Sequence, residues 1–102
     1  MKKKNYTKKE IAKQVAGRLD LPASKTHEVV AETFNVMREM MSEDRDITRI
    51  ELRNFGTFSV KPAKAKPRAR NPRTNEEVYV PPHRKSHFKP GKLLKSSLRK
   101  PL

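Results

Sequence analysis

Two apolar stripes lie side by side between residues 24 and 41, and they constrain the fold of this chain more than any other feature. Apolar residues spaced by three and four positions predict a helix there. The stripes are Val29/Thr33/Val36/Met40 and Val30/Phe34/Met37/Met41. A chain of 102 residues has little core with which to cover so wide a face. We therefore expect a dimer in which a second chain covers one stripe; a single broad core contact is the alternative.

A shorter helix is predicted before this segment, and strands are predicted after it. Thr7 and Glu10 fit a capping box, and apolar residues then recur every four positions as far as Leu19. From Thr48 onward apolar and charged residues alternate with the period of a strand, and the chain reverses at or near Gly56 into a second strand. Helices followed by strands predict an α+β fold.

A basic stretch follows the predicted strands. Residues 63–75 read AKAKPRARNPRTN, and in an extended chain the alternating cations would share one side. A solvated, mobile tail is the alternative, because an isolated peptide of this composition would be disordered. Asn71-Pro72 and Asn75 suit a tight turn, and residues 77–80 can return as an antiparallel strand. The sequence therefore favours a two-stranded arm. Its alternating cations are Lys64, Lys66, Arg68 and Arg70.

Prolines mark the end of this arm and the start of the last helix. Pro81-Pro82 ends the returning strand, because proline cannot donate to a ladder. Pro90-Gly91 then leads into a short basic helix, predicted from Lys92 to about Lys100. Leu94 and Leu98 are expected on its inner face.

Positive charge is concentrated in the second half of the chain. Residues 1–60 hold 12 Lys/Arg against 9 Asp/Glu and residues 61–102 hold 13 against 2, so +11 of the total +14 lies after residue 60. This asymmetry is typical of a polyanion binder, most often of nucleic acid. A membrane-surface helix needs an apolar stripe beside its cations, which residues 61–75 lack. No stretch reaches the roughly 18 apolar residues of a membrane span, so we expect a cytoplasmic protein.

No enzyme or cofactor motif is recognisable. The absence of cysteine removes thiolate metal sites and cysteine nucleophiles. His83 and His87 have the spacing of two metal ligands on a helix, but Pro81-Pro82 opposes a helix there and no acidic residue nearby completes a site. The three glycines form no phosphate-binding loop. We predict no enzymatic activity, metal, cofactor or small-molecule substrate.

Three motifs, in their order and spacing, are similar to those of a known family. They are NFGTF (54–58), ARNPRTN (69–75) and HFKPGKLLK (87–95). Over about residues 7–100 the chain resembles the HU and integration host factor family of bacterial DNA-bending proteins. The resemblance implies a helical base and a three-stranded antiparallel sheet that extends into a β-ribbon arm, in an intertwined dimer. The residues that match core positions of the family are Phe55, Phe58 and Phe88.

The same resemblance implies an architectural function in the nucleoid. The chain would be a single DNA-binding domain over residues 1–102, with a basic extension at 1–6 and the arm at 61–82. As a homodimer, or a heterodimer with a paralogue, it would bind the minor groove of duplex DNA, bend the DNA and compact the nucleoid, with weak or moderate sequence preference. Charge alone would also fit an RNA-binding structural component such as a small ribosomal protein, but A-form RNA resists the kink that a wedge requires.

The resemblance also assigns roles to individual residues. Pro72 matches the proline that wedges between base pairs at each arm tip. Arg70, Asn71 and Arg73 match the neighbours of that proline. A rigid apolar ring can unstack a base step, and guanidinium groups suit a narrow, electronegative groove. Lys89, Lys92 and Lys95 match residues that meet the phosphate backbone. The predicted DNA-binding residues are Arg53, Lys61, Lys64, Lys66, Arg68, Arg70, Asn71, Pro72, Arg73, Lys89, Lys92 and Lys95.

Glu51 and Arg53 point to one branch of the family. Within RIELRNFG they resemble the beta subunit of integration host factor, where the equivalent arginine, held by the glutamate, helps to read a preferred sequence in the minor groove. A solvent-facing cross-strand pair is the alternative. Asn54, Ala69 and Asn75 depart from the family, which usually has glycine at these positions.

Overall fold

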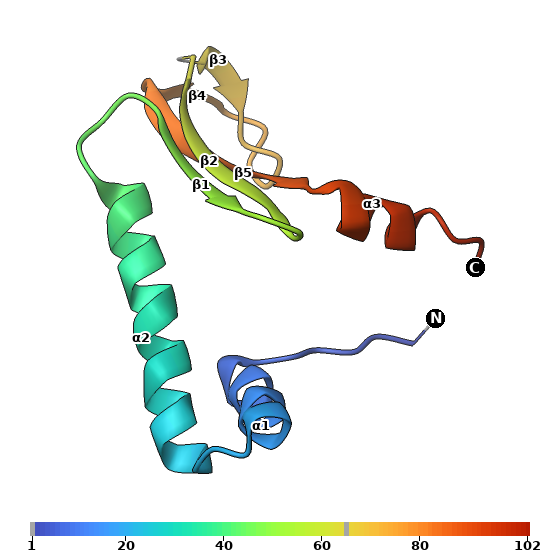
Figure 1. Ribbon diagram of the computed structural model, residues 1–102. Helices are drawn as coiled ribbons and strands as arrows, with labels where there is room; N and C mark the ends of the chain where they lie inside the picture. Colours follow the sequence, from blue (N-terminus) through green and yellow to red (C-terminus); the bar gives the residue numbers. More distant parts are fainter. Residues whose placement is uncertain (1, 65) are drawn as a thin grey trace. The chain divides into compact units, whose positions relative to one another are not determined.

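The computed structural model describes residues 2–64 and 66–102. Over these residues the order of elements is α1, α2, β1, β2, β3, β4, β5 and α3 (Figure 1). The chain divides into two compact units, which meet between Met40 and Met41. The first unit is helical, and the second carries the strands and the last helix.

The first unit contains α1 (Lys8–Leu19) and most of α2 (Ala23–Ser42), within a residue of the predicted helices. Thr7 is at the N-cap of α1 as predicted, but its hydroxyl makes no capping hydrogen bond, so the capping box is not formed. Instead, the Thr7 carbonyl accepts the Ile11 N–H at 3.1 Å, the ordinary helical bond. Among the described residues no helix is long and apolar enough to cross a membrane.

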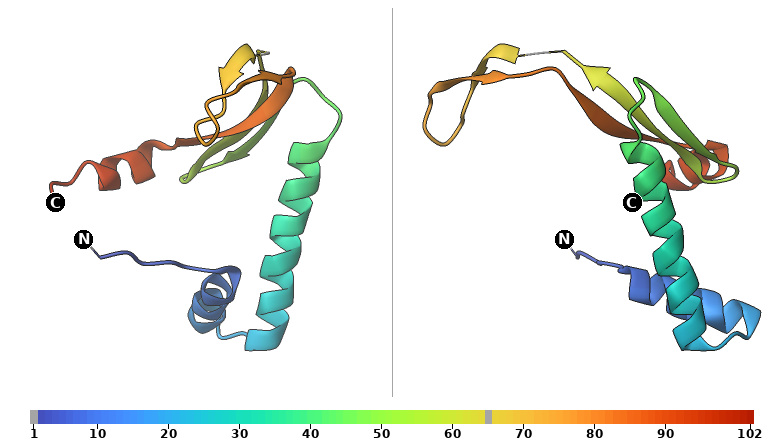
Figure 2. Two further views of the ribbon diagram at one scale, coloured as in Figure 1. Left: turned by 180° about the vertical axis from the view of Figure 1, so that it is seen from behind. Right: turned by 90° about the vertical axis from the view of Figure 1, so that its left-hand side faces the viewer.

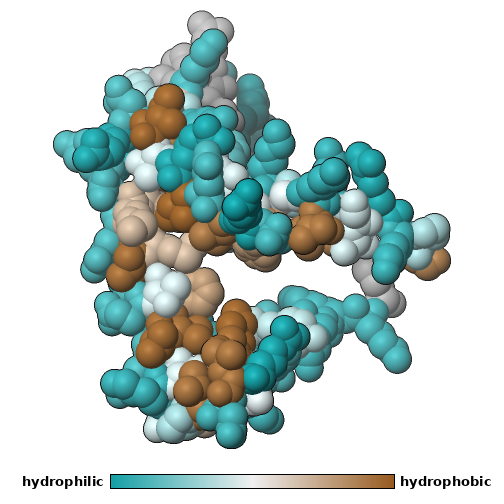
Figure 3. All heavy atoms as spheres, viewed as in Figure 1, coloured by the Kyte–Doolittle hydropathy of each residue, from teal (hydrophilic) through white to brown (hydrophobic). Residues whose placement is uncertain are grey.

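The two stripes of α2 differ in exposure. In the first stripe Val29 is 57% exposed, and Val36 and Met40 are also exposed. In the second stripe Met37 is half-buried, whereas Phe34 remains exposed. Figure 3 shows apolar side chains, in brown, open at the surface of the helical unit. The chain alone therefore leaves much of this wide apolar face in contact with water.

The second unit is built on a three-stranded antiparallel sheet, as the resemblance implied. Its strands β1 (Thr48–Leu52), β2 (Gly56–Ala63) and β5 (His83–Pro90) lie in the order β1-β2-β5. Figure 1 shows the long central strand β2 running beside β5. The pattern of the sequence did not predict β5 as a strand, because Phe88 is the one large apolar residue in it.

Three phenylalanines form the apolar centre of one sheet face. The ring centroids of Phe58 and Phe88 are 4.7 Å apart, and those of Phe55 and Phe88 are 5.4 Å apart. Ile50 lies opposite Phe58 in the ladder and adds to the same face. The predicted core positions are therefore in contact. Phe55 and Phe88 nevertheless remain exposed in the single chain.

The turn between β1 and β2 uses one asparagine and one glycine for different reasons. Asn54 takes a left-handed conformation with φ of 69°, which asparagine tolerates better than most residues. Gly56 opens β2 opposite Pro90, and a Cβ there would lie 2.6 Å from the Lys89 carbonyl oxygen. Asn54 thus meets the conformational demand of the turn, and Gly56 allows the strands to approach.

The arm is a second, two-stranded sheet of β3 (Lys66–Arg70) and β4 (Glu77–Val80). In Figure 2 it lies beyond the ends of β2 and β5. Its register shifts between Lys66 and Ala69, so the strict alternation predicted for residues 63–70 does not continue through β3. The irregularity surrounds Pro67, which has no N–H to donate to the ladder.

The last helix, α3 (Lys92–Leu98), follows β5 directly. The Gly91 N–H donates to the Phe55 carbonyl at 2.8 Å and so ties the start of α3 to the β1–β2 turn. Leu94 is half-buried as predicted, but Leu98 is 68% exposed, so the prediction of an inner face for both leucines is wrong for the single chain. Leu98 lies in the last turn, beyond the contact with the sheet that holds the start of α3.

Candidate nucleic-acid interface

The strand register gathers polar and basic residues on the side of the three-stranded sheet that faces away from the phenylalanines. Ser59 at the centre pairs with Arg49 on β1 and with His87 on β5. Two residues further along β2, Lys61 lies opposite Lys85. We call this side the outer face. Its residues are Arg49, Glu51, Thr57, Ser59, Lys61, Lys85, His87 and Lys89.

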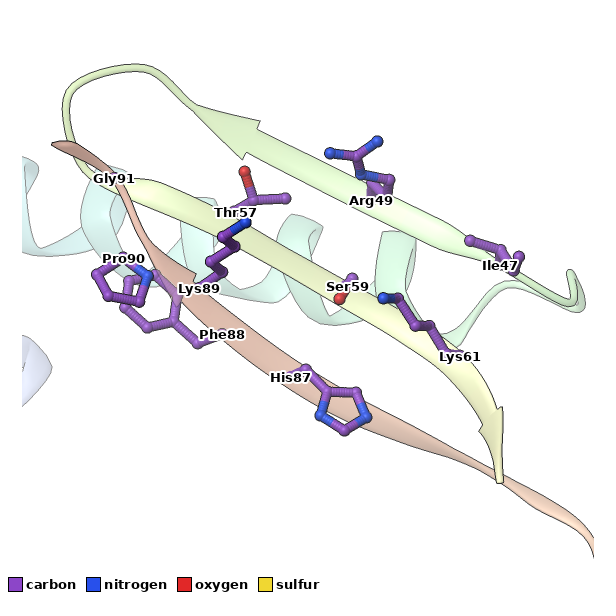
Figure 4. Close-up of a pocket in the computed structure, with 10 residues that line it drawn as sticks. All are labelled: Ile47, Arg49, Thr57, Ser59, Lys61, His87, Phe88, Lys89, Pro90 and Gly91. Carbon is purple, nitrogen blue, oxygen red and sulfur yellow. The ribbon is translucent and has the colours of Figure 1, made fainter. Parts of the chain in front are cut away.

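The charges of the outer face suit an anion. Glu51 supplies the carboxylate among these residues, and its Oε1 is 3.2 Å from Arg49 Nη2. Lys61 and Lys85 are like charges directly across the ladder, which is unfavourable in the free protein. A phosphate between them would relieve that repulsion. Figure 4 shows an open hollow over this face, with Lys61, Ser59 and Lys89 among its lining residues.

Lys61 and Lys89 of this face were predicted from the sequence, whereas Arg49, Lys85 and His87 were missed. The signal for the missed residues is the period of two along β5, where Lys85, His87 and Lys89 follow one another at every second position. A strand places such residues on one side. The signal becomes useful only when residues 83–90 are recognised as a strand.

Arg84 points to a different use of a cation. Its Nη1 donates to the carbonyl oxygens of Glu43 and Arg45, the latter at 3.1 Å. These carbonyls belong to the connection between α2 and β1, so Arg84 fastens that connection to β5. Since its guanidinium is engaged with the backbone, Arg84 acts as a structural anchor beside the base of the arm.

The base of the arm carries further predicted cations. Lys64 is exposed just after β2 ends. Lys66 and Arg68 belong to β3 by their backbone, and their side chains lie outside the described part of the structure. The prediction that they bind DNA therefore stays a prediction.

The arm tip, residues 70–77, is a hydrogen-bonded turn. Asn71 takes part three times: its N–H donates to the Glu76 carbonyl at 2.8 Å, its carbonyl accepts the Asn75 N–H at 2.7 Å, and its Oδ1 accepts the Arg73 N–H at 2.9 Å. Pro72 is exposed inside this turn. The residues at the turn predicted a two-stranded arm rather than a mobile tail, and the structure contains this arm.

Arg70 is held at the arm tip by two side chains. Its Nη1 donates to Asn75 Oδ1 at 3.2 Å, and its Nη2 is 3.6 Å from Glu77 Oε1. Arg73, by contrast, is exposed and makes a backbone contact to Asn71. The two arginines that the resemblance assigned to the tip therefore differ in how firmly they are oriented.

Two other groups of predicted residues lie apart from the tip. Lys92 and Lys95 are exposed on α3, one turn from each other. Arg53 is exposed in the β1–β2 turn, and the ion pair formed by Glu51 is with Arg49, so the expected hold of Glu51 on Arg53 is not present in this structure. No group of three metal-ligand side chains gathers among the residues that are described.

A helical unit followed by a sheet that extends into a basic two-stranded ribbon defines the class of β-ribbon nucleic-acid-binding proteins. Comparison with known proteins identifies the family. The model of the bacterial DNA-binding protein family matches residues 6–99. The chain belongs to this family, the one that contains HU and integration host factor, whose members are architectural DNA-binding proteins.

Individual relatives agree with this assignment. Integration host factor subunit beta of Methylococcus capsulatus is 37% identical over 92 residues, which cover 87% of this chain and 90% of that one. Integration host factor subunit alpha of Hydrogenovibrio crunogenus is 32% identical over 92 residues, with 90% and 91% covered. The solved Anabaena HU–DNA cocrystal structure superposes with a TM-score of 0.79 at 27% identity, over 94% of this chain and 100% of that chain.

Proposed function

We propose that two copies of this chain bind duplex DNA across their outer faces, insert their arms into the minor groove and bend the DNA by intercalation of Pro72. Phosphate contacts supply most of the affinity, and the arms supply the geometry. The protein performs no catalytic step. Bending of this kind compacts DNA, and the protein would act in the bacterial nucleoid.

The observation that carries this proposal is the connection between the outer face and the arm. Lys61 and Lys85 lie opposite each other, two pairs before the β2–β5 ladder ends, and Lys64 follows toward β3. DNA that rests on this face would therefore meet the arm as a continuation of the same surface. Cations in such a series neutralise phosphates and release counterions, which is the main source of affinity in many DNA complexes.

The dimer is supported by the apolar surface that the single chain leaves open. Among the described residues the buried hydrophobic side chains are Ala12, Ala16 and Val60, a very small core. A second chain would cover the exposed stripe of α2 and the open side of the phenylalanine cluster. We propose that residues 1–102 form a single DNA-binding domain. A second copy is the simplest partner, and a paralogue is the alternative.

The arm tip would supply the kink. Pro72 is exposed in a turn whose backbone is held by hydrogen bonds, so its ring can enter a base step at a reduced ordering cost. Asn71 and Arg73 would contact the groove on either side of it. Lys89, Lys92 and Lys95 would contact phosphates away from the arm. Arg53 would add a modest sequence preference.

The test is a bend-angle measurement by energy transfer across a duplex labelled at both ends, with binding measured in parallel. We expect a large bend at saturating protein and stronger binding to nicked than to intact duplex. A matched RNA duplex should compete poorly, because A-form RNA has a wide, shallow minor groove. Equal competition by RNA, or binding without a bend, would refute the proposal.

A further inference from the structure

The guanidinium of Arg70 is fixed from two directions before any DNA is present. Glu77 lies directly opposite Arg70 in the β3–β4 ladder, and its carboxylate is 3.6 Å from Nη2. Asn75 lies in the turn, and its Oδ1 accepts from Nη1 at 3.2 Å. All three side chains are exposed, so each contact alone is weak. Two contacts at different nitrogens nevertheless restrict the plane and direction of the guanidinium.

Asn75 meets two requirements at once. Its φ of 61° is left-handed, and its N–H closes the turn on the Asn71 carbonyl. Glycine would adopt this backbone more easily, but it has no side chain to accept from Arg70. Asparagine tolerates the conformation and leaves its amide oxygen available. Asparagine at this position therefore supplies a side-chain acceptor for Arg70 in addition to the left-handed backbone, for which glycine would be sufficient.

The charge of the arm tip does not explain attraction to DNA. Residues 70–77 contain Arg70 and Arg73 against Glu76 and Glu77, so their formal charges cancel. The two glutamates also differ. Glu77 pairs with Arg70, whereas no ion pair of Glu76 is found among the described residues. Orientation of the arginine, rather than net charge, is what this arrangement provides.

We propose that Asn75 and Glu77 are positioning residues that present the Arg70 guanidinium to the minor groove in one orientation, two residues before the Pro72 wedge. This inference rests on the proposed function. A side chain that is ordered in the free protein loses less freedom on binding. Arg70 would therefore support the kink made by Pro72. It would contribute less to the salt dependence than an unpaired arginine, since Glu77 offsets part of its charge.

The first test replaces Asn75. Asn75→Gly keeps the left-handed backbone but removes the acceptor, so affinity for a nicked duplex should fall roughly 2- to 12-fold, equivalent to freeing one ordered side chain. The bend angle should also decrease. Asn75→Asp keeps both the acceptor and the backbone tolerance, so it should bend DNA like the wild type, although its added negative charge should weaken general DNA binding. In an Arg70→Ala background, Asn75→Gly should change affinity less than 2-fold, because the two positions act through the same group.

The second test compares the neighbouring glutamates. Glu77→Gln and Glu76→Gln each remove one negative charge, so both should strengthen general DNA binding to a similar degree. Only Glu77→Gln replaces the carboxylate that pairs with Arg70 by a neutral amide and so weakens the hold on the guanidinium. Only this variant should therefore reduce the bend angle. Glu76→Gln is thus the control for charge alone.

The outcomes separate this inference from the function on which it rests. If the wild-type protein does not bind and bend DNA, the proposed function fails. If it does, and Asn75→Gly bends DNA like the wild type, the inference is overturned. A loss that persists in the Arg70→Ala background would also overturn it, because Asn75 would then act only on the turn.

Discussion

The outer face of the sheet and the arm tip are both expected to touch DNA, yet they are built on opposite principles. The outer face places two like charges, Lys61 and Lys85, directly opposite each other in the free protein, which is unfavourable. At the arm tip Arg70 is paired with Glu77, and the formal charges of residues 70–77 cancel. A surface that holds uncompensated charge gains free energy when phosphates replace counterions. A hydrogen-bonded tip without net formal charge gains free energy from the fit of its shape to the DNA groove.

This difference separates affinity from geometry within one small unit. Removing a cation from the outer face should weaken binding to every duplex and flatten the salt dependence. Changing the tip should alter the bend while much of the affinity remains. The following predictions test that separation, beginning with the largest effect.

The first prediction concerns the dimer. Separating affinity from geometry in this way requires two outer faces and two arm tips in one DNA-bound protein. Val36→Asp places a carboxylate in the exposed stripe of α2, where a dimer interface would have to desolvate it. We expect a monomer at micromolar concentration, and a loss of DNA affinity of about 10²- to 10⁴-fold as the linked second face is lost. Sedimentation equilibrium and DNA titration measure the two effects. Glu39→Ala, on the charged side of α2, is the control, and a Val36→Asp protein that stays dimeric would contradict the prediction.

The next effect concerns the outer face. A triple variant, Lys61→Gln, Lys85→Gln and Lys89→Gln, should weaken binding roughly 100-fold or more at about 0.1 M salt, since each phosphate contact contributes about 0.9 to the slope of log affinity against log salt. The slope should decrease in magnitude by roughly 2 to 3 per chain. Titration of one duplex over a range of salt concentrations measures both. If the slope is unchanged, the outer face does not contact phosphates.

Much of this comparison could be predicted from the sequence, and the part that could not has a physical cause. The helices, the wide apolar face of α2, strands β1 and β4, and the turn at Asn75 follow from local patterns. These patterns report the nearest neighbours of a residue along the chain. The residues of β5 do not alternate between apolar and polar. Their strand is defined by pairing with β2, whose residues lie at least 20 positions earlier in the chain.

The details of the site were missed for the same reason. Arg49, Lys85 and His87 share a face only because Ser59 lies between Arg49 and His87 in the ladder. The contact between Arg70 and Glu77 likewise depends on the register of the arm, which Pro67 disturbs. Leu98 was expected to be inside, but its cover is not supplied by this chain. Long-range register and the partner chain are the two kinds of information that a local pattern lacks.

A variant of Arg53 tests whether the part of the protein outside the arm recognises the base sequence of DNA as well as its phosphate charge. Arg53→Ala should narrow the difference between the best and an average DNA site by about 1–3 kcal/mol and leave the bend intact. Arg49→Ala is the matched control, because Arg49 is paired with Glu51 on the outer face. Competition binding with a library of duplexes measures the difference. An equal loss of affinity on all sequences would mean that Arg53 contacts only phosphate.

The smallest effect on affinity and the clearest effect on geometry should come from Pro72→Ala. No cation is lost, and Pro72 is exposed in a turn fixed by other residues, so the fold and most of the phosphate-led affinity should remain. Without the ring, the few kcal/mol needed to unstack a base step are no longer offset by wedge contacts. The bend angle should therefore decrease, and the preference for nicked duplex should change.

A mobile basic tail would give the opposite result. Its proline could become alanine without any change in bend angle, while loss of Lys64, Lys66, Arg68 and Arg70 would weaken binding to every duplex alike. Thr74→Ala is a suitable control, because it changes the same exposed turn and removes one long hydrogen bond, from the Glu76 N–H at 3.4 Å, but neither a ring nor a charge. Energy transfer across a labelled duplex at saturating protein compares the three proteins directly. Identical angles for wild type and Pro72→Ala would exclude the wedge and leave the arm with a role in charge alone.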